Sequence, residues 1–166
     1  MSATLDQQQL RRLMVRWATG VAVVTSRDET GPRGATTNAL ASLSLDPLLM
    51  LVCLDRGSNT LAAVGASRRF CINILAADQE EIARRFATKA SGEEKLAGIA
   101  HEPIEGVPVL GGVLAWLVCE LERELDGGDH AILLGRPLET GSDEDAEPLL
   151  FYGGRYHPAP VQLRTT

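Results

Sequence analysis

Short apolar segments, separated by turn residues, recur along this 166-residue chain and constrain its fold more than any other feature. Residues 48–54 (LLMLVCL) are apolar at every position, which predicts a strand covered on both faces, and residues 69–75 (RFCINIL) predict a second buried strand. Residues 113–125 (VLAWLVCELEREL) begin apolar and then alternate. The turn DGGDH leads them into HAILLGRPLE, so a long antiparallel pair is expected.

A few helices are expected between the strands. Apolar residues at helical spacing predict an N-terminal helix that ends near residue 20 and lies against a sheet: Leu10, Leu13, Met14 and Trp17. Asp78 and Glu81 have capping-box spacing at the start of a predicted helix, and Ser91 and Glu94 repeat that spacing at the start of another. Many short strands with a few helices indicate a single-domain β-barrel with helical plugs.

Composition argues against several classes of function. The net charge is −6, no stretch is basic, and only seven aromatic residues are present, so nucleic acid is not an expected partner. No apolar run reaches the roughly 18 residues of a membrane span, and no export signal is recognised, so a cytoplasmic protein is expected. The three cysteines lie far apart in apolar segments, which predicts reduced thiols and no metal site.

The loop DRGSNT, residues 55–60, is the first candidate binding segment. Ser58 and Thr60 follow a predicted buried strand and precede a predicted helix, so hydroxyls and backbone N–H groups converge there as in an anion site. Arg56, Arg84 and Arg85 are candidates to complete a phosphate site. The alternative is a turn in which Ser58 or Thr60 merely caps the helix.

The segment TTNALAS, residues 36–42, is a second candidate. The amide of Asn38 both donates and accepts hydrogen bonds, which suits the edge of a heterocycle such as an isoalloxazine ring. The alternative is a loop amide that satisfies its own backbone.

His130 is the third candidate, because it follows two glycines and Asp129 at the entrance to a predicted strand. A side chain there can project into a cleft, although a histidine at a turn is often simply solvated. Neither a nucleotide-binding glycine motif nor a nucleophile motif occurs elsewhere in the chain.

The order of these segments resembles a known family. The succession GVAVVTS, PRGATTNALASLSLDPLLMLVCLDRGSNT, RFCINIL, ARRFA, GDHAILLG and LLFYGGRY is similar to the flavin reductases among the FMN-binding split barrels, from about Leu10 to Tyr156. These are the small reductase components of two-component flavin-dependent monooxygenases. The resemblance implies one split β-barrel domain of Greek-key type over residues 1–166, with an acidic loop at 142–147.

The resemblance also implies which residues form the site. The flavin ring, ribityl chain and phosphate would be bordered by Thr37, Asn38, Ala39, Ser42, Cys53, Leu54, Asp55, Ser58, Thr60, Arg85 and Phe86. Some members carry serine at the position of Ala39, so one hydroxyl contact is absent here. The nicotinamide would be faced by His130, the candidate catalytic residue, with Asp129, Arg155 and Tyr156 nearby.

The implied activity is hydride transfer from NADH or NADPH to FMN or FAD, with the reduced flavin passing to a partner oxygenase. A homodimer is also implied. Two alternatives remain at this point: a split barrel that binds flavin without turnover, and a flavoprotein whose bound FMN acts directly on a small substrate. The His130 segment favours the reductase, because a pure flavin binder needs no nicotinamide site.

Overall fold

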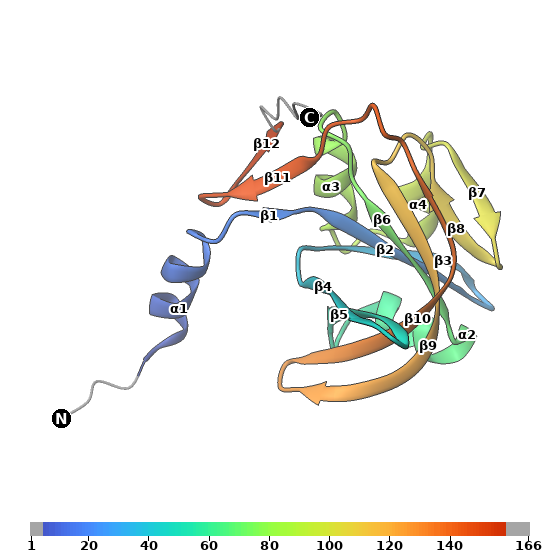
Figure 1. Ribbon diagram of the computed structural model, residues 1–166, viewed down its shortest axis with the longest axis horizontal. Helices are drawn as coiled ribbons and strands as arrows, with labels where there is room; N and C mark the ends of the chain where they lie inside the picture. Colours follow the sequence, from blue (N-terminus) through green and yellow to red (C-terminus); the bar gives the residue numbers. More distant parts are fainter. Residues whose placement is uncertain (1–4, 159–166) are drawn as a thin grey trace.

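A seven-stranded antiparallel sheet forms the body of the molecule in the computed structural model, which describes residues 5–158 (Figure 1). The strand order is β3-β2-β6-β9-β10-β5-β4. The strands are β2 (Ala22–Asp28), β3 (Gly31–Thr37), β4 (Leu40–Leu45), β5 (Leu48–Asp55), β6 (Arg69–Ile74), β9 (Ala115–Gly127) and β10 (His130–Ser142). Edge strand β3 also contacts β5, so the sheet curls into a barrel whose wall is not closed by a ladder between β3 and β4.

Two smaller sheets and four helices complete the described chain. One sheet has the order β1-β11-β12 and the other is a hairpin of β7 and β8. These strands are β1 (Thr19–Gly20), β7 (His101–Ile104), β8 (Val107–Leu110), β11 (Leu149–Tyr152) and β12 (Arg155–Pro158). The helices are α1 (Gln7–Met14), α2 (Asn59–Ser67), α3 (Glu80–Phe86) and α4 (Gly92–Leu96). The prediction of a mainly β protein with a few helices is confirmed.

Local signals account for several element boundaries. The long β9–β10 hairpin is confirmed, with His130 paired to Gly127 across a turn in which Gly128 has a φ of 81°. The Ser91 capping box is confirmed as well: Ser91 Oγ accepts from the Glu94 N–H at 3.2 Å, and Glu94 Oε2 accepts from the Ser91 N–H at 2.8 Å. Short-range hydrogen bonds are enough to specify both features.

The predicted capping box at Asp78 and Glu81 is wrong. The N-cap of α3 is Gln79, one residue later, and its side chain makes no capping hydrogen bond. Gln79 Oε1 instead accepts from the Ala76 N–H at 3.0 Å, and its Nε2 donates to the Gly111 carbonyl at 3.0 Å. A buried tertiary contact therefore replaces the local cap.

Residues 48–54 do form a strand, β5, but the prediction that the rest of the chain covers both of its faces is wrong. Val52 and Leu54 are buried in the barrel core, whereas Leu48 is 55% exposed. Strand β6 meets that expectation, because four of its six residues are buried in succession. One face of β5 thus lacks a covering layer in the described chain.

Helix α1 overlaps the predicted segment but ends at Met14 rather than near Gly20, and it does not lie against a sheet. It stands away from the body of the molecule (Figure 1), and none of its residues is buried. Its apolar side chains are exposed, with Trp17, just beyond the helix, at 67%. The helical spacing correctly indicated an apolar stripe on Leu10, Leu13 and Met14, but within residues 5–158 nothing covers that stripe.

The three cysteines are free thiols. Cys71 and Cys119 are fully buried, and burial raises the pKa of Cys119 to about 12 and the pKa of Cys71 further. Cys53 is half-buried, and its pKa is raised for the same reason. Within residues 5–158, no helix is long and apolar enough to cross a membrane.

Candidate functional site

A cleft of about 780 Å³ lies between strand β3, the loop that leads into α2, and the α3–α4 segment. A smaller cavity of about 190 Å³ adjoins it, since Thr36 and Ala87 line both. A third, of about 350 Å³, shares Val21 and Asn38 with the second. These three neighbouring cavities, of which the first two are lined by β3, are together called the β3 cleft.

The loop at residues 55–60 forms one wall of the β3 cleft and is folded by its own hydrogen bonds. Asp55 Oδ1 accepts from the Gly57 N–H at 2.7 Å, and the Asp55 carbonyl accepts from the Ser58 N–H at 3.0 Å. Ser58 caps α2 by accepting from the Thr60 N–H at 3.1 Å. Ser58 therefore serves as a helix cap and also lines the cleft.

Thr60 differs from Ser58 in having no internal role for its hydroxyl. The residue is 2% exposed and lines the β3 cleft, and its hydroxyl forms no hydrogen bond with the part of the chain that the structure describes. No side-chain oxygen or nitrogen of the described residues is both buried and without a partner, so the Thr60 hydroxyl reaches the solvent of the cleft, where a ligand oxygen can replace water as its partner. Thr60 is thus available to an anion.

Phe86 and Gly34 form the opposite side of this end of the cleft. The Phe86 ring is buried against β3 at Gly34, where an added Cβ would lie 2.4 Å from Phe86 Cε1. Only glycine leaves room for the ring there. Phe86, which the resemblance assigned to the site, lies at the cleft as a packing surface.

Lys95 lies at the same end of the cleft and was not predicted from the sequence. The side chain is 7% exposed, and its Nζ donates to the Gly34 carbonyl at 2.9 Å and to the Phe86 carbonyl at 3.3 Å. Burial lowers the pKa of Lys95. The scarcity of lysine is the one sequence signal available, because Lys89 is the only other lysine in the chain and lines the same cleft.

The structure does not bring Arg85 to the β3 cleft. Its Nη1 donates to the Ala97 carbonyl at 2.7 Å and its Nη2 pairs with Glu81 at 3.3 Å, beside a separate cavity. The guanidinium of Arg84 instead lies 5.1 Å from the ring centroid of Tyr156. Successive helix residues point about 100° apart, so the choice between the two arginines depends on how α3 packs.

The other end of the β3 cleft is apolar and aromatic. Val21, Phe151 and Tyr156 line it together with Asn38 and two threonines. The Asn38 amide donates to Thr19 Oγ1 at 3.1 Å and remains exposed, so its carbonyl oxygen stays free to accept. This end suits a flat ring whose edge carries polar atoms.

The remaining residues predicted at the flavin lie on β3–β5 around this end. Thr37 Oγ1 donates to the Cys53 carbonyl at 3.3 Å, and the Ala39 carbonyl accepts from the Cys53 N–H at 2.8 Å. Ser42 is exposed on β4, and the Leu54 side chain is buried in the core, away from the cleft surface. Backbone groups thus predominate along this stretch.

His130 and Asp129 lie together at the turn of the β9–β10 hairpin. His130 Nδ1 is 2.8 Å from Asp129 Oδ1, and the hydrogen bond from His130, together with its charge, lowers the pKa of Asp129. His130 is paired with Asp55 at the end of β5, so it borders the 55–60 loop. Arg155 and Tyr156 lie on β12 in a different sheet, with Arg155 exposed.

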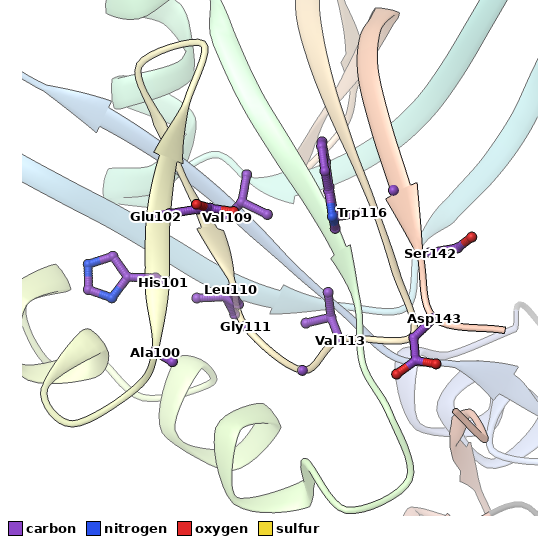
Figure 2. A pocket seen from close by; sticks show the side chains of 12 residues that line it. Ala100, His101, Glu102, Val109, Leu110, Gly111, Val113, Trp116, Ser142 and Asp143 are labelled. Atoms are coloured by element: carbon purple, nitrogen blue, oxygen red, sulfur yellow. The ribbon is translucent and has the colours of Figure 1, made fainter. Parts of the chain in front are cut away.

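A separate cavity of about 530 Å³ lies between the β7–β8 hairpin and the ends of β9 and β10 (Figure 2). Trp116 and Val113 form apolar parts of its wall, while Glu102 and Asp143 place carboxylates there. It contains none of the residues predicted at the flavin, and its acidic side chains disfavour a phosphate. The β3 cleft is therefore the candidate site.

Comparisons with known proteins identify the family of this chain. Residues 14–160 match the model of the flavin reductase like domain. The chain belongs to the flavin reductase-like family. The reductase subunit HsaB of a flavin-dependent monooxygenase from Rhodococcus jostii is 37% identical to this flavin reductase over 154 residues, which cover 92% of this chain and 77% of HsaB.

Two further relatives are the FMN reductase (NADH) SmoA of Agrobacterium fabrum and the NADH:FAD oxidoreductase SgcE6 of Streptomyces globisporus. SmoA is 35% identical over 151 residues, covering 91% of this chain and 85% of SmoA. SgcE6 superposes with a TM-score of 0.88 and 34% identity, covering 97% of this chain and all of that structure. The predicted family, the split-barrel-like fold and the NAD(P)H-dependent flavin reductase activity are confirmed.

The residues of the β3 cleft fit a flavin nucleotide. A buried cation and the free Thr60 hydroxyl lie at one end, and an aromatic, apolar surface with exposed amide atoms lies at the other. A flavin nucleotide carries an anionic phosphate towards one end and a flat ring with polar edge atoms at the other, so each end of the cleft matches one part of it. Because Thr36 and Ala87 line both the 780 Å³ part and the adjoining 190 Å³ part of the cleft, a single elongated ligand can span these two parts.

Proposed function

We propose that this flavin reductase binds FMN or FAD along the β3 cleft, with the phosphate at Ser58 and Thr60 and the ring beside Asn38. The observation that supports this most is the continuity of the cleft, from a buried cation at one end to aromatic side chains at the other. When bound, the flavin supplies the redox chemistry by accepting a hydride from the nicotinamide. The protein's contribution is alignment and exclusion of water.

Each wall of the cleft has a distinct part in this alignment. The Ser58 and Thr60 hydroxyls and the first turn of α2 hold the anionic end. Thr37 and the Ala39 carbonyl tie the end of β3 to β5, which keeps the segment beside the ring rigid. Tyr156, with Arg84 over its ring, closes the apolar end.

His130 is the residue we assign to the nicotinamide, with Asp129 orienting its imidazole through the 2.8 Å contact. The hairpin that carries both residues is tied to the 55–60 loop, since Arg56 Nε donates to the Gly128 carbonyl at 2.9 Å and its guanidinium pairs with Asp126. A nicotinamide held there would lie close to a flavin anchored by the same loop. Arg155, exposed on β12, is assigned to the same co-substrate.

The test is oxidation of NADH and of NADPH by the purified protein, with and without added FMN or FAD, followed by absorbance of the reduced nicotinamide. Flavin-dependent oxidation is expected with at least one nicotinamide. If oxidation stays at the buffer rate in all combinations, turnover is refuted, and the alternative of a split barrel that binds flavin without turnover takes its place.

A homodimer is the second part of the proposal. Apolar side chains are exposed on α1 and on the β4–β5 hairpin, including Leu13 at 61%, Leu45 at 81% and Leu48 at 55%. Exposed apolar surface on this scale is typical of an interface. Sedimentation should give about twice the 17.8 kDa chain mass at micromolar concentration, and a monomer would refute the dimer.

The reduced flavin is expected to leave for an oxygenase component, as the monooxygenase reductase relatives imply. Because the three thiols are free, a reducing compartment, the cytoplasm, is the expected location. The test for transfer is substrate hydroxylation when an oxygenase is supplied with this reductase as its only source of reduced flavin.

A further inference from the structure

Lys95 is a buried cation without a carboxylate partner. Among the residues that the structure describes, no Asp or Glu oxygen lies within 4.0 Å of its Nζ. Arg33, which lines the same cleft, is by contrast paired with Asp28 at 3.2 Å. A buried ammonium that is stabilised only by carbonyl groups is costly in free energy.

The hydrogen bonds of Lys95 leave one donor free. An ammonium group has three N–H donors, and two of them reach the carbonyls of Gly34 and Phe86. The third has no acceptor in the described chain, and the side chain lines the same cavity of the β3 cleft as Ser58 and Thr60. The two carbonyl contacts also prevent the ammonium from swinging out to solvent, so its charge is held at the cleft wall.

We propose that Lys95 binds the phosphoryl group of the flavin through this third N–H and thereby makes the cleft select FMN and FAD over riboflavin. The proposal rests on the proposed function, because it places the flavin phosphate in this cleft. Riboflavin has the same ring and ribityl chain but no phosphate, so it gains nothing from the ammonium. The charge of Lys95 therefore acts on one part of the ligand only.

The experiment compares FMN and riboflavin binding, by quenching of flavin fluorescence, in the wild type and in Lys95→Gln. Glutamine keeps an N–H₂ donor for the two carbonyls and removes the charge. FMN affinity is expected to fall by about tenfold to a hundredfold, as for a lost hydrogen bond to a charged group, while riboflavin affinity changes little. The matched control is Lys89→Gln, an exposed lysine of the same cleft, for which a much smaller loss is expected.

Three results would overturn the proposal: equal losses of FMN and riboflavin affinity in Lys95→Gln, no loss of either, or an equal loss of FMN affinity in Lys89→Gln. The first would make Lys95 a structural residue. If the wild type binds neither flavin, the proposed function itself fails, and Lys95 has no flavin phosphate to hold.

If Lys95→Gln does not fold, the proposal can be tested by NMR of the Lys95 side chain in protein that retains this lysine. With only two lysines in the chain, labelled lysine side chains give two NMR signals, and Lys89→Arg leaves only that of Lys95. Adding FMN should shift the Lys95 signal, whereas riboflavin should not. A Lys95 signal that FMN leaves unchanged, or that both flavins shift equally, would contradict the proposal.

Discussion

Replacing Thr60 with valine should weaken flavin binding without weakening the fold. Valine has nearly the volume of threonine, and the Thr60 hydroxyl makes no hydrogen bond that the described chain would lose. The free energy of unfolding should therefore change by less than about 0.5 kcal/mol. A hydrogen bond to a charged group contributes about 1.5 to 3 kcal/mol, so the FMN dissociation constant should rise by roughly 10- to 150-fold.

The assay pairs FMN titration, followed by fluorescence quenching, with urea unfolding of the same samples. Ser58→Ala is an informative contrast, because loss of its cap on α2 should lower the free energy of unfolding by about 1 kcal/mol while also weakening FMN binding. Thr140→Val, on an exposed part of β10, should change neither quantity. An unchanged dissociation constant in folded Thr60→Val would place the phosphate elsewhere.

Three further predictions concern other parts of the molecule. Gly34→Ala should lower the free energy of unfolding by about 1 to 3 kcal/mol in urea, because its Cβ would meet the Phe86 ring, whereas Gly20→Ala, with no atom within 4 Å, should cost less. His130→Ala should raise the nicotinamide KM or lower kcat in stopped-flow reduction and leave flavin affinity unchanged; lost flavin affinity with normal reduction would contradict this role. An aromatic disulfide reagent at pH 8 should label at most one thiol in the native protein and three after unfolding, because burial raises the pKa of the other two; labelling of all three in native protein would contradict this.

Much of the fold was predictable from the sequence, because its signals are local. The β9–β10 hairpin follows from alternating residues around a Gly-Gly-Asp turn, and the Ser91 capping box follows from two side chains three residues apart. The 55–60 loop was likewise recognisable as the end of a strand and the start of a helix. The expectation of a flavin ligand rested on the resemblance of the ordered segments to a known family, because the residues alone indicated only an anion site.

Other features depended on contacts that no local pattern records. Gln79 replaced Asp78 at the start of α3 because its amide reaches Gly111, 32 residues further along the chain. The apolar stripe of α1 was correctly placed on a helix, but periodicity does not say which surface covers it. A helix shows its amphipathic face in its sequence, whereas the partner of that face is a tertiary or quaternary matter.

The charge at the β3 cleft shows the difference most directly. Arg84 and Arg85 carried the sequence-based expectation of a phosphate partner, yet the packing of α3 turns one towards Tyr156 and the other towards Glu81. Lys95 lies in a short helix and has an ordinary sequence environment, and only the approach of β3 and α3 buries it and leaves it one free donor. The sequence by itself determined features with local signals, such as the β9–β10 hairpin, the Ser91 cap and the 55–60 loop. The tertiary structure decided which cation faces the cleft, because burial and the positions of distant carbonyls exist only once the chain has folded.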